Sequence, residues 1–105
     1  MIIEKCTLPI GIEHKGQIHR ETEVRPRQVK DLILAYNNDL MNKSKHSYEI
    51  CCLTEQIIKL GDIPKEEITA DLILEMYVDD FDTLAEAAEK ARQRAASFRD
   101  KQSGE

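Results

Sequence analysis

Residues 5–24, KCTLPIGIEHKGQIHRETEV, decide the fold of this 105-residue chain. Apolar and polar residues alternate along both arms of the stretch, as in strands that bury one face. The arms meet in a polar segment, residues 13–17, whose glycine suits a tight turn. We therefore expect a β-hairpin over residues 5–24. Because a two-stranded hairpin is marginally stable alone, its apolar face must pack on the helices or on another chain.

The register of the hairpin depends on which residues must share a face. A two-residue turn at Lys15-Gly16 would place Ile12 opposite His19, and the apolar residues of the two arms would then face opposite ways. A three-residue loop, residues 14–16, pairs Ile12 with Ile18 and makes one face apolar, with its glycine at the left-handed position of a bulged turn. We expect this second register. The remaining predicted pairs are Leu8 with Thr22 and Cys6 with Val24.

Helical spacing follows the hairpin. Arg25-Pro26 ends the second strand and suits the first turn of a helix. Apolar residues then recur every three or four positions, at Val29, Leu32, Ile33 and Tyr36. A second helix is expected to begin near Ser44 or Ser47, either of which is a good N-cap. Its apolar face continues through residues 57–58 to Gly61, which is placed as the C-terminal cap.

Two further helices complete the chain. Thr69 caps a short third helix, whose apolar residues are Leu72, Ile73, Met76 and Tyr77. Asp79-Asp80 opens the last helix. Its apolar residues recur in steps of three and four, like a heptad seam, at Phe81, Leu84, Ala88, Ala91, Ala95 and Phe98. This seam either packs on the chain's own domain or is offered to another chain.

These elements predict an α+β fold, an N-terminal β-hairpin followed by about four α-helices. A chain of this length has room for one domain, which spans residues 1–105. Within it, the hairpin covers residues 5–24, the helical part covers residues 26–100, and residues 101–105 are expected to fray.

Acidic residues outnumber basic ones and are unevenly distributed. Twenty Asp and Glu against fifteen Lys and Arg give a formal charge of −5. Residues 62–89 hold ten acids and one base, whereas residues 90–101 hold five bases and one acid. This order suits a helix whose charges complement its dipole, or an electrostatic patch for a partner. A smaller basic group, interleaved with acids, is expected to be a solvated surface: Arg20, Arg25, Arg27 and Lys30.

The composition argues against nucleic acid and membranes as partners. A protein that neutralises many phosphates carries a basic face, which the acidic balance does not favour. No apolar run approaches the ~20 residues of a membrane span. Residues 1–5 show no secretory signal, so we expect a cytoplasmic protein.

No pattern of residues predicts catalysis or metal binding. The chain has no P-loop, no dinucleotide-binding glycine pattern and no nucleophile elbow. Its cysteines, Cys6, Cys51 and Cys52, are an odd number with an adjacent pair, so no disulfide framework is expected. A site of Cys6 with His14 and His19 has the spacing of no common zinc motif. We expect no enzymatic activity, no cofactor and no metal.

Several short motifs follow one another in a characteristic order. The N-terminal ones are Leu8-Pro9-Ile10-Gly11, Lys15-Gly16, Arg20, Arg25-Pro26 and Asp31. The later ones are Leu60-Gly61, Ile68-Thr69, Asp79, Asp82 and Leu84, followed by Ala85 or Ala88. Over residues 8–95 this order resembles that of the tail assembly chaperones of Mu-like bacteriophages, which have an LPxG strand, a glycine turn and an arginine-containing helix entry. Residues 42–46 and Cys51-Cys52 match nothing in the family pattern.

The resemblance implies a non-enzymatic role in assembling a phage or prophage tail. Chaperones of this family bind the tape-measure protein, keep its apolar helices soluble and help to recruit tail-tube subunits. The implied location is the bacterial cytoplasm, and the implied protein is absent from the mature virion. We expect the tape-measure protein, the tail-tube protein and a second copy of this chain as partners. The candidate contact residues are Leu72, Met76, Phe81, Leu84, Ala88 and Ala91.

Two other classes of function compete with this one. The first is a small acidic regulatory adaptor that binds one folded partner. The second is a small enzyme or metal protein, for which the Cys6, His14 and His19 group would have to bind zinc.

Overall fold

Three antiparallel strands form one sheet in the order β1-β2-β3. The computed structural model describes residues 1–103, and the strands are β1 (Glu4–His14), β2 (Gln17–Val24) and β3 (Ile57–Leu60). The helices are α1 (Val29–Tyr36), α2 (Asp39–Lys43), α3 (Tyr48–Gln56), α4 (Ala70–Leu74) and α5 (Val78–Ser103), with short 3-10 turns at Lys45–Ser47 and Lys65–Glu67. The hairpin followed by helices confirms the predicted α+β fold.

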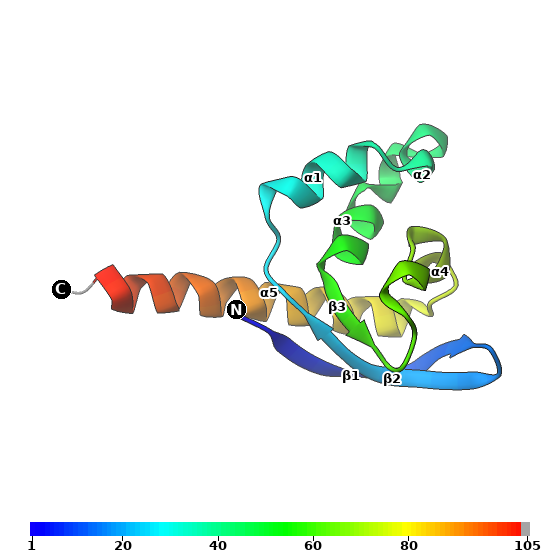
Figure 1. The fold of residues 1–105 in the computed structure, drawn as a ribbon, viewed down its shortest axis with the longest axis horizontal. Coiled ribbons are helices and arrows are strands. Elements are labelled where there is room, and N and C mark those ends of the chain that lie inside the picture. The colour runs from blue at the N-terminus through cyan, green and yellow to red at the C-terminus, as the bar shows by residue number, and fades with distance from the viewer. Residues whose placement is uncertain (104–105) are drawn as a thin grey trace.

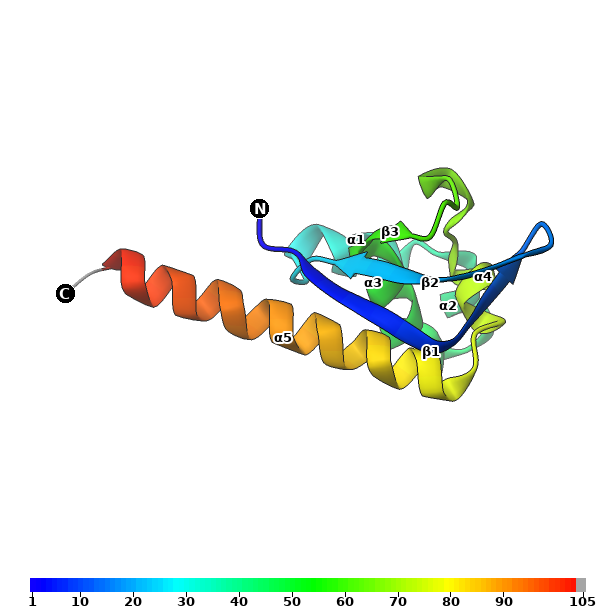
Figure 2. The ribbon, with the colours of Figure 1, turned by 90° about the horizontal axis from the view of Figure 1, so that it is seen from below.

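The long helix α5 determines the shape of the molecule. It has 26 residues and contacts β1, and its C-terminal end extends beyond the rest of the chain (Figure 1 and Figure 2). The molecule is therefore elongated, with extents of 50 × 30 × 23 Å. Residues 101–103, which we expected to fray, continue α5, and residues 104–105 lie outside the described part of the chain.

The main core lies between the sheet and the helices α3, α4 and α5. Its largest fully buried side chains are Leu8, Ile12, Leu53, Ile57, Leu60 and Leu84. Burying one such side chain contributes about 1.5–3 kcal/mol. A second cluster joins α1 to α3 and α4 through Ala35, Ala70 and the adjacent Cys51 and Cys52. The cysteine pair thus packs as small apolar residues.

Two predicted helix starts are confirmed, and a third lies further along the chain than we expected. Ser47 precedes α3 as its N-cap residue. Thr69 caps α4, because its hydroxyl oxygen accepts a hydrogen bond from the Leu72 amide at 3.3 Å. The helix that we placed after Pro26 begins only at Val29.

The hairpin is present, but its register is not the one that we predicted. Lys15 (φ 52°) and Gly16 (φ 80°) form a two-residue turn, as in the hairpin turns that match the twist of the strands. Ile12 pairs with His19, and Ile18 is exposed instead of facing the core. Nearer the base of the hairpin, the observed pairs are Cys6 with Thr22 and Glu4 with Val24.

A bulge in β1 reconciles this turn with a single apolar face. Residues 8–11 of β1 lie opposite the single residue Arg20 of β2. Because the additional residues are odd in number, the alternation along the pair is reversed at the bulge. Near the base of the hairpin Thr22 is buried, and near the tip His19 is buried against Gly61 and Asp62. Our prediction assumed two regular strands. With regular strands, only a three-residue loop could bring the apolar residues to one face, and we therefore predicted such a loop instead of a bulge.

Asp80, in the first turn of α5, holds this bulge. Its fully buried carboxylate accepts hydrogen bonds from the amides of Ile10 and Gly11, each at 2.8 Å. Arg20 Nε donates to the Ile10 carbonyl at 3.0 Å. Gly11 has a φ of 100°, and a Cβ atom there would lie 2.6 Å from the Ile18 side chain, so the position requires glycine. From the sequence we had assigned Asp80 only to the helix dipole.

Residues 57–60 form a third strand where we predicted the end of a helix. The helix α3 stops at Gln56, whose side-chain amide donates to the Arg25 carbonyl at 2.9 Å. The Arg25 amide in turn donates to the Gln56 carbonyl at 3.0 Å. These bonds hold the end of α3 beside the end of β2, so the next residues pair with β2 as a strand. Ile57 and Ile58 suit this strand, because isoleucine is favoured in sheets. Gly61 (φ 55°) follows the strand and is not the helix cap that we predicted.

Removing the Asp80 carboxylate should destabilise the whole fold. In Asp80→Ala, the buried Gly11 amide and the partly buried Ile10 amide lose their acceptor, and each unsatisfied buried group costs about 1–3 kcal/mol. We expect the free energy of unfolding, measured by urea titration, to fall by about 3 kcal/mol. The control Asp82→Ala changes an exposed acid of the same helix and should stay within about 0.5 kcal/mol of the wild type. Equal effects of the two substitutions would contradict this role of Asp80.

Candidate functional site

The six predicted contact residues lie mainly inside the molecule. Leu84 and Ala91 are fully buried against the chain's own core. Leu72, Met76, Phe81 and Ala88 are partly buried and pack against the same core. The N-terminal two thirds of the seam on α5 therefore packs on the sheet. Towards its end the seam leaves the sheet, and Phe98 is 51% exposed.

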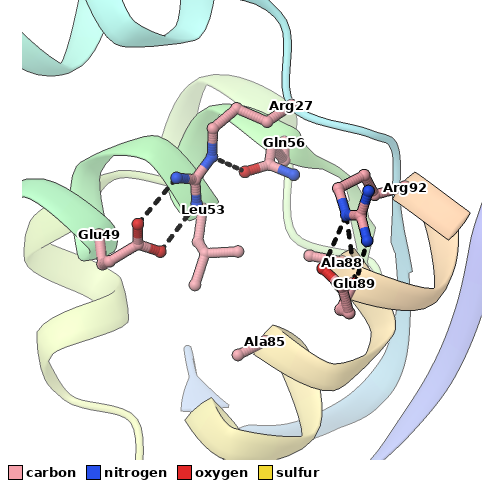
Figure 3. Close-up of a pocket in the computed structure, with 8 residues that line it drawn as sticks. All are labelled: Arg27, Glu49, Leu53, Gln56, Ala85, Ala88, Glu89 and Arg92. Atoms are coloured by element: carbon pink, nitrogen blue, oxygen red, sulfur yellow. Dashed lines mark hydrogen bonds and ion pairs between the residues drawn. The ribbon is translucent and has the colours of Figure 1, made fainter.

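Ala88 also lines a groove between α3 and α5 (Figure 3). The groove has a volume of about 330 Å³, and its apolar floor is formed by Leu53, Ala85 and Ala88. Its rim is charged and polar, formed by Arg27, Glu49, Gln56, Glu89 and Arg92.

The charged groups of this rim are paired with one another. Arg27 makes two hydrogen bonds of 2.8 Å with the Glu49 carboxylate, and its Nε donates to the Gln56 side chain at 2.8 Å. Arg92 Nη2 lies 2.6 Å from the Glu89 carboxylate. The hydrogen bonds from Arg27 lower the pKa of Glu49, so both partners stay charged at neutral pH. The groove thus has a small apolar floor, and the charged groups on its rim are already paired.

A larger apolar surface lies on α1. Four large apolar residues of this helix are between 47% and 73% exposed: Val29, Ile33, Leu34 and Tyr36. Val29, Ile33 and Tyr36 are spaced at i, i+4 and i+7, so they lie on one side of the helix. We call these four residues the α1 face. The sequence predicted three of these residues, Val29, Ile33 and Tyr36, as apolar positions at helical spacing.

A buried ion pair explains why α1 turns this stripe outward. Arg25 forms two hydrogen bonds with the Asp31 carboxylate, at 2.8 and 2.7 Å, and Asp31 is fully buried. The same carboxylate accepts from the Gln28 amide at 2.8 Å. The side of α1 that carries Asp31 and Ala35 is thereby fixed against α3, and the Ile33 side faces outward. We had expected Arg25 to be a solvated surface residue.

The pKa of Asp31 shows how this pair depends on pH. Burial alone would raise the pKa, but the hydrogen bonds from Arg25 and the Gln28 amide leave it below its ordinary value. A lowered pKa in the folded state stabilises the fold above the pKa of the unfolded chain, about 3.9. This contribution is lost as the pH falls through the folded-state pKa.

The sulfur and imidazole groups do not assemble into a reactive site. Within residues 1–103, no three His, Cys, Asp or Glu side chains are placed to hold a metal ion. Burial raises the pKa of all three thiols, Cys6, Cys51 and Cys52, so the nucleophilic thiolate is disfavoured. His19 Nδ1 accepts a hydrogen bond from the Asp62 amide at 3.2 Å, and His14 contacts Glu67 at 2.9 Å.

The Arg25–Asp31 pair should make stability depend on acid pH. In Asp31→Asn, Arg25 loses its charged partner, and we expect a loss of about 3 kcal/mol at pH 7. As the pH falls from about 4 through the lower folded-state pKa of Asp31, the wild type progressively loses the same contribution, so the difference between the two proteins should shrink. Urea titrations at several pH values measure this. Asp39→Asn, at an exposed acid of α2, is the control, and a constant difference at all pH values would contradict the assignment.

A charge at Ala91 should unfold the single chain and not merely its assemblies. Ala91 is fully buried, and a buried carboxylate without a partner is strongly unfavourable. We expect Ala91→Glu to lower the free energy of unfolding by about 3 kcal/mol or more. Ala96→Glu, on the exposed part of the same helix, should have little effect in circular dichroism melts. A fully stable Ala91→Glu protein would show that this part of α5 is not held in the core.

Comparisons with known proteins add no relative. No protein-family model, no curated protein and no solved structure matches this chain. Among residues 1–103, no helix combines the length and the apolar character needed to cross a membrane.

Proposed function

We propose that this chain is a tail assembly chaperone of a phage or prophage, which binds apolar helices of the tape-measure protein and catalyses no reaction. The bound client would remain soluble until tail-tube subunits are recruited to it. In this proposal the α1 face binds the client.

The observation that carries the proposal is the exposure of the α1 face. Soluble monomers rarely expose large contiguous apolar patches, and such patches mark sites of interaction. Side chains at i, i+4 and i+7 are the spacing with which one helix packs along another. Tyr36 extends this surface towards α3, because its ring lies 5.3 Å from that of Tyr48. A helical client would thus find aliphatic and aromatic side chains along the length of α1.

Contacts within the fold keep the α1 face exposed. The buried Arg25–Asp31 pair holds it, and removing one partner of a buried pair costs about 3–5 kcal/mol. A rotation of α1 that buried Ile33 would have to break this pair and expose the Ala35 side. The face therefore stays outward when no client is bound.

The residues that resemble the family support the proposal in another way. Leu8 to Gly11 form the bulge, Arg25 and Asp31 form the buried pair, and Leu84 lies in the core. The resemblance therefore rests on residues that build the fold. The four residues of the α1 face are not among the motifs that carry the resemblance. In this proposal they are where one chaperone of this kind could differ from another in its client.

The net charge also suits a chaperone. The chain has a net charge of −5. A net charge away from zero favours the solubility of a complex with an apolar client. The acids are concentrated in residues 62–89, outside the sequence of α1, whose own charged residues are the exposed Lys30 and the buried Asp31.

A matched pair of isoleucine variants tests the proposal. The chain is co-expressed with the tape-measure protein of the same phage or prophage, and the soluble fraction of that protein is measured. We expect the wild type to raise it and Ile33→Lys to weaken the complex at least tenfold, because a lysine on the α1 face would be buried under the client. Ile18→Lys places the same charge on an equally exposed isoleucine of the hairpin and should behave like the wild type.

Two outcomes would contradict the proposal. The first is a tape-measure protein whose solubility does not change with the wild-type chain. The second is equal binding by both lysine variants, which would move the contact away from α1. Binding of one folded protein that is unrelated to tail assembly would favour the regulatory adaptor instead.

A further inference from the structure

The two ends of α5 carry exposed apolar residues within surroundings of opposite charge. We propose that these two surfaces bind each other in neighbouring copies of the chain, so that copies associate head to tail. This interface is separate from the α1 face and does not depend on the proposed client.

The first surface is the turn between α4 and α5, which we call the acidic knuckle. Its apolar residues, Leu74, Tyr77 and Val78, are between 47% and 72% exposed. Exposed acids lie beside them in the sequence at Glu75, Asp79 and Asp82. The knuckle belongs to the most acidic part of the chain, residues 62–89, which has a net charge of −9.

The second surface lies where α5 leaves the rest of the molecule, and we call it the basic cleft. It is a hollow of about 500 Å³ between the C-terminal half of α5, the first residues of the chain and residues 25–28. Its apolar lining is formed by Met1, Ile2, Pro26, Ala95 and Phe98. The surrounding part of α5, residues 90–101, has a net charge of +4, and within it Arg92 is paired with Glu89 and Arg94 with Glu4.

The two surfaces are complementary in charge, and both carry apolar side chains. The knuckle projects large side chains, one of them aromatic, and the cleft is a hollow with apolar walls. Its volume lies within the about 300–1,000 Å³ of pockets that enclose ligands. Acids around the knuckle would meet bases around the cleft, and such complementarity selects the partner and its orientation.

Only a second copy brings these surfaces together. Val78 and Phe98 lie twenty residues apart on one continuous helix, a separation of roughly 30 Å, so they are near the two ends of α5, which lie far apart in Figure 2. A copy that binds a knuckle in its cleft still presents its own knuckle to another copy. Such a contact closes into a ring when the rotation between copies allows it, and otherwise continues as an open chain.

A mixing experiment tests the head-to-tail arrangement. Val78→Lys places a positive charge in the acidic knuckle, and Phe98→Glu places a negative charge in the basic cleft. Both residues are at least half exposed, so the fold should persist. By analytical ultracentrifugation we expect the wild type to self-associate at high micromolar concentration and each variant alone to be monomeric. An equimolar mixture should form one-to-one dimers, because one intact knuckle and one intact cleft remain.

Salt and control variants complete the test. Raising the ionic strength from ~0.1 M to ~1 M shortens the Debye length from about 10 Å to about 3 Å and should weaken the association. Ile33→Lys, on the α1 face, should associate like the wild type. If circular dichroism shows that either variant is unfolded, Glu75→Lys and Lys101→Glu replace the pair.

Three results would overturn the proposal. A wild type that stays monomeric at low salt shows that the surfaces do not bind each other. Variants that associate as strongly as the wild type place the interface elsewhere. Two monomeric variants that fail to form a dimer when mixed show that the copies do not bind knuckle to cleft.

Discussion

The carboxylate of Asp80 is the contact on which the rest of the structure depends. It binds the amides of Ile10 and Gly11, and so it joins the start of the last helix to the bulge of the first strand, seventy residues earlier. The bulge sets the register of the hairpin, and the register decides which side chains of β2 enter the core. The same bond places the first turn of α5 against β1, and the rest of that helix follows across the sheet.

A second carboxylate has a comparable role in the helical part. Asp31 pairs with Arg25 at the point where β2 ends, and Arg25 also donates to the Glu55 carbonyl at 3.0 Å. One guanidinium thus connects the end of the sheet, the first turn of α1 and the last turn of α3. The apolar α1 face is exposed because this polar cluster takes the inner side of the helix, and the surface proposed to bind a client is a consequence of that cluster.

Local sequence predicted those elements whose cause is local. The alternation in the hairpin, the cap at Thr69 and the acids that open α5 act within one turn or one strand pair, and the structure confirms these elements. The register, the third strand and the outward face of α1 depend on contacts between distant residues. Regular alternation cannot reveal a bulge held by Asp80, and a helical stripe does not show which side of α1 an ion pair has taken. The six predicted contact residues were selected by apolarity at helical spacing, which the buried side of a helix shares with a docking surface.

The way α5 is supported has consequences for its dynamics. Up to Ala91 its apolar side is covered by the core, whereas among residues 92–101 every residue except Ala95 is exposed. Backbone amides in the covered part should exchange with deuterium only when the molecule unfolds, while those beyond it should exchange through local fraying. The same fraying should let trypsin cleave at the basic residues of this outer part. Slower exchange and cleavage there would reveal when the end of the helix is occupied by another molecule.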